Sequence, residues 1–109
     1  MNKLVVVIET RGFTRRVAEL LADNEYTARQ WFLRRQPSSG DVIQRTGGAR
    51  KLRWKQKGQG KIGGLRVIYF HPSRRDELWM LALYAKTEQE DLSAADKKIV
   101  KGLIEEIKK

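Results

Sequence analysis

Three stretches of this sequence alternate between apolar and polar residues, and no helical pattern separates them. They cover residues 50–55, 65–70 and 78–84. Side chains of an extended strand point alternately to its two faces, so the alternation predicts three half-buried strands. Short connections join these strands, which predicts an antiparallel meander.

An apolar strand and two helices precede this meander. Residues 3–9 contain a continuous β-branched run that predicts a buried strand. Apolar residues at helical spacing over 13–21 predict a first helix. Asp23 or Asn24 is a suitable cap for a second helix, which ends before Pro37. We expect Ala28, Trp31 and Phe32 to share one face of this second helix, with Tyr26 and Leu33 near it.

One more helix follows the meander. Ser93 and Asp96 have the spacing of a capping box, which predicts that a helix begins there. Residues 36–48 are rich in loop-forming residue types. The expected order is β-α-α-β-β-β-α in a single domain over residues 1–109. This order predicts an α+β fold of two layers, in which helices cover one face of an antiparallel sheet and leave the other face open.

Positive charge is concentrated in the middle of the chain. The 109 residues carry a net charge of +10. Residues 42–75 contain ten basic side chains and no acidic one, whereas the rest of the chain has thirteen of each sign. A surface adapted only for solubility mixes its signs. The segment therefore predicts a polyanionic partner such as a nucleic acid.

The N-terminal apolar run, Leu4 to Ile8, is only five residues long. A secretory signal needs about 7–15 apolar residues and a membrane span about 20. The sequence contains no cysteine, so it has neither disulfides nor thiolate metal ligands. We therefore expect a cytoplasmic protein that does not associate with a membrane.

Two features that could indicate small-molecule chemistry have simpler explanations. Residues 58–63 spell GxGxxG, but a strand is predicted after them where a dinucleotide site requires a helix. His71 is the only histidine and lies in a predicted turn, without the partners that zinc or a catalytic triad needs. Because residues 42–75 lack carboxylates, we expect no pair of catalytic acids among them. The sequence predicts neither a metal nor a cofactor.

Basic side chains should gather on the open face of the sheet. The polar face of the first meander strand carries Lys51, Arg53 and Lys55, Arg66 lies on the next strand, and Lys86 follows the third. An arginine grips phosphate oxygens with its planar fork. A lysine crowded by other cations loses proton affinity and can act as a base. Taken alone, these residues fit RNA binding and RNA cleavage equally well.

Several blocks of sequence resemble the HigB-type branch of the RelE/ParE toxin superfamily. They span the segment from Gly40 to Ser93, half of the chain, and they occur in the order of the family. The blocks are Gly40–Ile43, Thr46–Arg53, Gly60–Tyr69, Leu83–Lys86, Glu88 and Asp91–Ser93.

This resemblance implies the toxin of a type II toxin–antitoxin system. Such a toxin is a metal-independent endoribonuclease that enters the decoding site of the ribosome, cleaves mRNA and so inhibits translation. It also implies a cognate antitoxin, typically a helix-turn-helix protein of the HigA type.

The resemblance assigns roles to four residues. Lys51 and Arg53 match the basic strand pair of RelE-like sites, one as the base and the other steadying the phosphate. Arg66 would stabilise the developing charge, and Lys86 would help the leaving oxygen or grip the RNA. Some relatives carry a tyrosine shortly after that last basic residue, and none follows here, so the general acid stays open between Tyr84 and Lys86. The residues expected to contact RNA are Arg50, Lys55, Lys57, Lys61 and Tyr84.

Two alternatives remain at this point. A ParE-like relative would inhibit DNA gyrase without cutting nucleic acid, because the superfamily shares one fold. A non-catalytic RNA- or ribosome-binding protein would need the same positive charge. Converging cations favour the ribonuclease, since a gyrase inhibitor does not require them.

Overall fold

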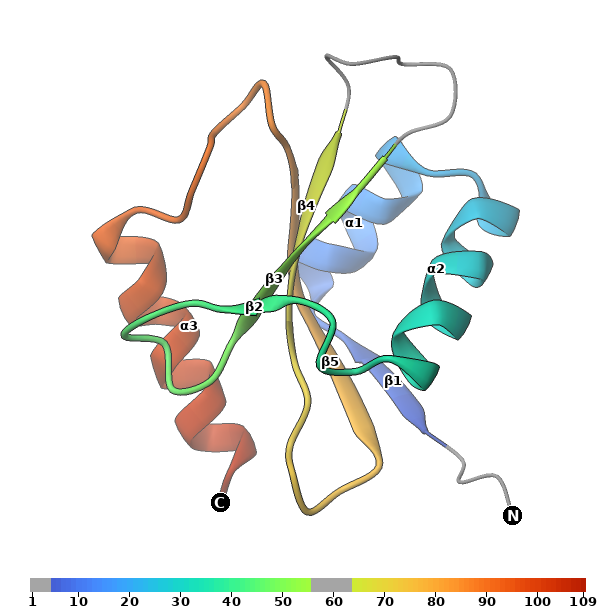
Figure 1. The fold of residues 1–109 in the computed structure, drawn as a ribbon. Helices are drawn as coiled ribbons and strands as arrows, with labels where there is room; N and C mark the ends of the chain where they lie inside the picture. Colours follow the sequence, from blue (N-terminus) through green and yellow to red (C-terminus); the bar gives the residue numbers. More distant parts are fainter. Residues whose placement is uncertain (1–4, 56–63) are drawn as a thin grey trace.

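The computed structural model describes residues 5–55 and 64–109. Five strands and three helices lie within this part of the chain (Figure 1). In chain order they are β1 (Val6–Glu9), α1 (Arg11–Leu20), α2 (Asp23–Arg35), β2 (Asp41–Val42), β3 (Arg50–Trp54), β4 (Leu65–Phe70), β5 (Glu77–Ala85) and α3 (Ala94–Ile107).

The five strands form one mixed sheet in the order β1-β5-β4-β3-β2. The predicted meander is confirmed, because β3, β4 and β5 pair antiparallel. The prediction of an entirely antiparallel sheet is wrong, because β1 pairs parallel with β5. An apolar run does not specify strand direction. Here the whole stretch from α1 to β4 separates the two strands, which gives the chain ample length for the crossover that a parallel pair requires.

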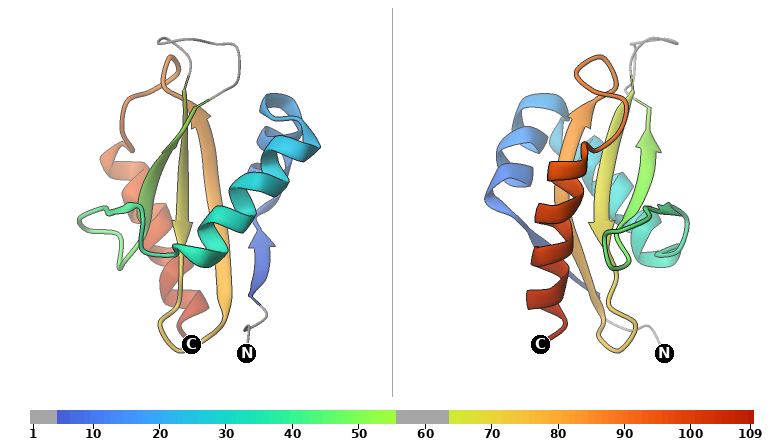
Figure 2. Two further views of the ribbon diagram at one scale, coloured as in Figure 1. Left: turned by 45° about the vertical axis from the view of Figure 1, so that its right-hand side comes forward. Right: turned by 90° about the vertical axis from the view of Figure 1, so that its left-hand side faces the viewer.

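Helices cover both faces of the sheet. Helices α1 and α2 pack on one face and α3 lies across the other, with the sheet between them (Figures 1 and 2). The prediction of two layers with one open face is therefore wrong. Every residue of β4 is buried, because alternate residues enter two different apolar clusters. Val100 and Ile104 of α3 complete the second cluster, which includes Ile68 and Phe70 of β4.

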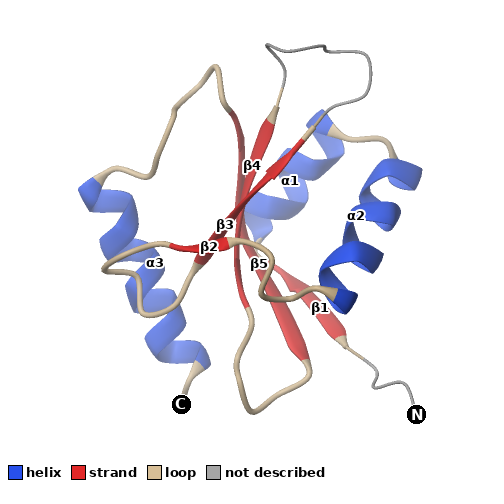
Figure 3. Ribbon diagram, viewed as in Figure 1, coloured by secondary structure: helices blue, strands red, loops and turns tan. Residues whose placement is uncertain are grey.

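The short strand β2 lies within the stretch that the sequence predicts to be a loop (Figure 3). Its two residues pair with Arg50 and Lys51 of β3. Gly40 just before it approaches the sheet closely: its amide donates to Tyr69 Oη at 2.9 Å, and a Cβ at this position would lie 2.9 Å from the Lys51 carbonyl oxygen. Only glycine fits that approach without displacing the chain.

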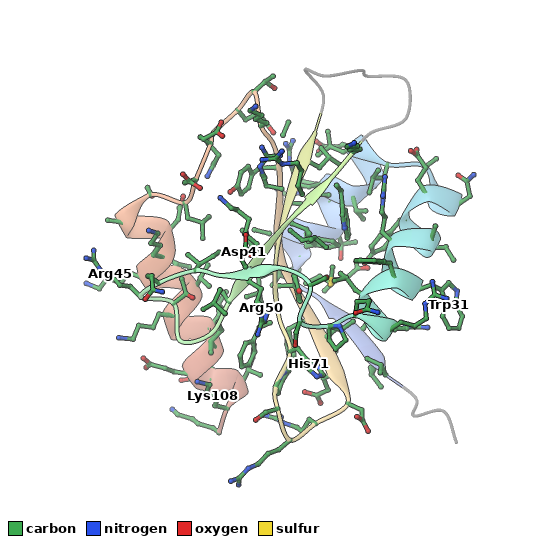
Figure 4. All side chains as sticks on the ribbon, viewed as in Figure 1. Trp31, Asp41, Arg45, Arg50, His71 and Lys108 are labelled. Carbon is green, nitrogen blue, oxygen red and sulfur yellow. The ribbon has the colours of Figure 1, made fainter. Side chains whose placement is uncertain are left out.

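Helix α2 turns a different face to the core from the one predicted. Leu33 is fully buried, whereas Trp31 and Phe32 are 55% and 42% exposed. Trp31 points away from the sheet, with the Arg34 guanidinium 5.2 Å from its ring centre (Figure 4). The inward stripe runs through Tyr26, which packs against the core beside Phe13.

Helix α3 begins as predicted. Ser93 Oγ accepts from the amide of Asp96 at 3.0 Å, and the Asp96 carboxylate accepts from the Ser93 amide at 3.4 Å. Two apolar residues of this helix, Ile99 and Leu103, stay exposed. No helix in the described ranges has both the length and the apolar character needed to cross a membrane.

Candidate functional site

Strands β3 and β4 bring three cations to one face of the sheet. Arg53 pairs directly with Arg66 across the two strands, and Lys51 pairs with Ile68. Trp54 alternates to the opposite face and enters the core beneath α1 and α2. All three cations line one cavity of about 260 Å³, together with Ser39, Asp41, Leu52 and Glu90. The sequence alternation thus brings together the three residues that it predicted would converge.

Arg66 is more deeply placed than predicted. Its side chain is 3% exposed, and its Nη1 atom is buried without a hydrogen-bond partner in the described part of the protein. A buried donor without an acceptor costs about 1–3 kcal/mol, and a charged donor costs more. The face is not the open surface that the sequence predicted, because α3 packs across it. The Nη1 atom of this guanidinium therefore lacks an acceptor among the residues that the structure describes.

The direct pairing of Arg53 with Arg66 is a second unfavourable arrangement. Like charges opposite each other on neighbouring strands repel and destabilise the sheet. An anion bound between the two guanidinium groups removes that repulsion, and a phosphate offers several oxygens to their planar forks. Both observations favour an anionic ligand at this position.

Tyr84 lies on the other side of Arg66 in the sheet register. Its ring is buried, and its Oη atom also lacks a partner among the described residues. Burial raises the pKa of the Tyr84 hydroxyl, and the negative charge of Asp91 raises it further. The hydroxyl therefore keeps its proton at neutral pH and can donate a hydrogen bond or a proton.

Carboxylates reach the site from outside the acid-free segment. Asp91 forms an ion pair with Lys51 Nζ, and the hydrogen bond from Lys51 holds the pKa of the Asp91 carboxyl below its usual range. Asp41 and Glu90 line the same cavity. The absence of carboxylates from residues 42–75 therefore does not keep acids away from these cations, because Asp41, Glu90 and Asp91 come from outside that segment. Asp91 belongs to one of the blocks that resemble the toxin superfamily, and that block is the sequence feature that could have indicated an acid at this site.

Other predicted site residues lie elsewhere. Lys86 is exposed just after β5, is not among the residues that line the cavity, and its side chain makes no hydrogen bond or ion pair with a described residue. Arg50 alternates away from Lys51, and its Nη1 donates to the Gly40 carbonyl at 2.7 Å and to the Ser38 carbonyl at 3.2 Å. Arg50 therefore anchors the segment before β2.

The remaining predicted RNA contacts are less informative. Lys55 is exposed after the end of β3. Lys57 and Lys61 lie outside the described residues. His71 is half-buried, with Nδ1 2.9 Å from the Glu77 carbonyl oxygen, which fits a structural role in the turn. Over residues 5–55 and 64–109, no three histidine, cysteine, aspartate or glutamate side chains are grouped as ligands for a metal ion.

Residues from four strands or connections therefore build the candidate site. In the cavity two arginines provide fixed positive charge and a lysine is paired with an acid. Tyr84, which keeps its proton, is not among the lining residues and adjoins the cavity through its pairing with Arg66. This set can bind an anion, stabilise charge that develops on it, and supply a proton. A comparison of the chain with models of known protein families finds no match.

Proposed function

We propose that this protein is an endoribonuclease of the RelE/HigB kind, a toxin that cleaves mRNA on the ribosome. The observation that carries the proposal is the buried Arg66 Nη1, which lies on β4 between Arg53 and Tyr84. Over residues 5–55 and 64–109, neither this nitrogen nor the Tyr84 hydroxyl has a hydrogen-bond partner. A phosphodiester supplies the missing acceptors. The order of elements and the mixed sheet are compatible with a RelE-like fold.

The proposed reaction is an internal transesterification of RNA. The 2′-hydroxyl attacks the adjacent phosphorus, the bond to the 5′-oxygen of the next nucleotide breaks, and the products are a 2′,3′-cyclic phosphate and a free 5′-hydroxyl. One proton leaves the 2′-oxygen and one reaches the 5′-oxygen. Negative charge builds up on the non-bridging oxygens in between, and fixed cations lower the barrier most at that stage.

Each residue of the site has a role in this scheme. Arg66 and Arg53 hold the non-bridging oxygens. Of Lys51 and Arg53, only Lys51 can become a neutral amine and take the 2′-proton, because arginine stays protonated. Tyr84 donates the proton to the leaving 5′-oxygen. In the free protein Asp91 forms an ion pair with Lys51, and the RNA phosphate replaces Asp91 as the partner of Lys51 when RNA binds.

The partners follow from charge and from the family resemblance. A net charge of +10 favours the polyanionic ribosome and its mRNA. The resemblance adds a cognate antitoxin of the helix-turn-helix type and a cytoplasmic location.

The test is cleavage of mRNA on purified ribosomes by Arg53→Gln and Arg66→Gln variants, with primer extension to locate the cuts. Arg35→Gln on α2 is the matched control, because it removes an equal charge from an exposed position on the opposite side of the sheet. Thermal unfolding verifies that each variant is folded. We expect each site variant to lose about 100-fold or more in cleavage rate, the usual effect of removing one preorganised donor to developing charge.

The other outcomes separate the alternatives. Folded site variants that cleave at the rate of the Arg35→Gln control would refute the proposal. Growth arrest with blocked supercoiling by DNA gyrase would identify the ParE-like activity instead. Tight ribosome binding with intact mRNA would identify a non-catalytic binding protein.

A further inference from the structure

A second group of cations lies beside the candidate site, on α3 and on the loop between β2 and β3. Arg45, Lys97, Lys98 and Lys101 line a cavity of about 270 Å³ whose only other lining residue is Ala94. None of these four side chains forms an ion pair within the described ranges. Gathering four like charges around one cavity is unfavourable, and a bound polyanion relieves that repulsion.

The loop that carries Arg45 is held firmly against α3. Thr46 is fully buried, and its Oγ1 donates to the Ile43 carbonyl at 2.7 Å and accepts from the Ala49 amide at 3.0 Å. Lys108 Nζ donates to the Gly47 carbonyl at 2.9 Å. The position of Arg45 is thus fixed by packing and hydrogen bonds.

Arg45 itself adopts a backbone conformation that is unusual for its type. Its φ is 67°, in the left-handed region, and among the described residues it is the only non-glycine with a positive φ. Residues held in such conformations cost about 1–3 kcal/mol and cluster at functional positions. The arginine side chain extends outward beside α3 (Figure 4). Arg45 thus has an unusual backbone conformation and lies next to three lysines. This combination favours a role in binding an anion over a role in solubility alone.

This group is connected electrostatically to the candidate site. The positive charge of Lys97 contributes to lowering the pKa of Asp91, the same carboxylate that pairs with Lys51. Lys97 is therefore within electrostatic range of the carboxylate that pairs with Lys51, and it lines the same cavity as Arg45. A single strand with one phosphate between Arg53 and Arg66 can continue toward these cations.

We propose that Arg45, Lys98 and Lys101 form a second phosphate-binding surface, which holds the RNA backbone next to the strand segment that is cleaved. The inference rests on the proposed function in taking RNA as the polyanion. It adds that the affinity for long RNA depends on α3 as well as on the sheet. A short oligonucleotide bound at the cleavage site is too short to reach this second surface.

The test measures the salt dependence of binding to fluorescein-labelled oligouridylates of four and twelve nucleotides by fluorescence anisotropy. Both probes carry 2′-deoxyuridine so that they are not cleaved. A triple variant, Arg45→Gln, Lys98→Gln and Lys101→Gln, removes three phosphate contacts. Each contact in a single strand contributes about 0.7 to the log–log slope, so the slope for the twelve-nucleotide probe should become shallower by about 2. The slope for the four-nucleotide probe should not change.

The matched control is the triple variant Arg11→Gln, Arg15→Gln and Arg35→Gln. It removes the same net charge from exposed positions on α1 and α2, across the sheet from α3. We expect both slopes of this control to equal those of the unmodified protein. Equal losses in the two triple variants would refute the inference, because net charge alone would then explain binding.

Two further outcomes also decide the question. The first is an unchanged salt slope for the variant Arg45→Gln, Lys98→Gln and Lys101→Gln, called the α3 variant here, together with loss of its binding to polyglutamate. That result would refute the inference and point to an acidic protein partner. The proposed function is judged separately by cleavage. If Arg53→Gln still cleaves mRNA while the α3 variant loses slope on the long probe, the cleavage scheme fails and the second surface stands.

Discussion

At the scale of single residues, competition for Lys51 controls access to the site. Asp91 holds the Lys51 amine in an exposed ion pair. Because the pKa of Asp91 lies below its usual range, its carboxylate stays charged throughout the neutral range and is protonated only as the pH falls through that lowered value. An incoming phosphate must therefore displace a carboxylate from Lys51 at physiological pH.

Replacing Asp91 with asparagine removes this competitor. We expect Asp91→Asn to bind the twelve-nucleotide deoxyuridine probe about two- to fivefold more tightly, the range of an exposed ion pair. The control is Glu106→Gln, which also removes one negative charge from an exposed ion pair, the one with Lys109 at the end of α3. Anisotropy titration of both variants decides: equal or weaker binding by Asp91→Asn would contradict competition at Lys51.

Tyr84 allows a separation of chemistry from stability. Its buried hydroxyl has no partner in the described structure, so Tyr84→Phe should fold with unchanged or slightly higher thermal stability. Loss of the proton donor should nevertheless slow mRNA cleavage about 100-fold. Because burial raises the pKa of Tyr84, the hydroxyl stays protonated throughout the neutral range, and its deprotonation should not limit cleavage there. A folded Tyr84→Phe protein with full cleavage activity would exclude this role.

At the scale of elements, the sequence predicted segments whose periodicity is strong and missed those without one. Alternation predicted three antiparallel strands over 50–55, 65–70 and 78–84, and they are confirmed to within one residue at each end. Capping chemistry predicted the helix start at Ser93, which is also confirmed. Strand β2 has two residues, too few to show alternation. Helix α2 contains apolar residues on several sides, so periodicity alone did not distinguish the Leu33 face from the Trp31 face.

The segment entering β2 gives a prediction about stability. Gly40→Ala places a methyl group 2.9 Å from the Lys51 carbonyl oxygen and from the Tyr69 ring, and neither can move freely. We expect a loss of about 1–3 kcal/mol in the free energy of unfolding, measured by urea denaturation. Gly102→Ala is the control: nothing lies within 4 Å of its Cβ position on α3, so it should gain about 0.5–1 kcal/mol. Equal effects of the two substitutions would show that no close approach exists at Gly40.

At the scale of the whole molecule, the site depends on contacts that the local sequence does not contain. The convergence of Lys51, Arg53 and Arg66 was predictable, because strand alternation fixes which face each side chain takes. The packing of α3 across that face was not, since its apolar stripe fits either face of a sheet. The sequence assigned the positive charge to one segment, whereas the fold adds lysines from α3 to Arg45 of that segment.

The most direct test of the site is nitrogen-15 NMR of the arginine side chains during titration with an uncleavable deoxyuridine oligonucleotide. The guanidinium resonance of Arg66 is assigned by its loss in Arg66→Gln. We predict that the Arg66 and Arg53 signals shift together and saturate as phosphate oxygens satisfy the buried Nη1, while Arg35 on α2 is unaffected. An Arg66 signal that stays unchanged when the oligonucleotide is fully bound would contradict the central claim that this guanidinium receives the phosphodiester.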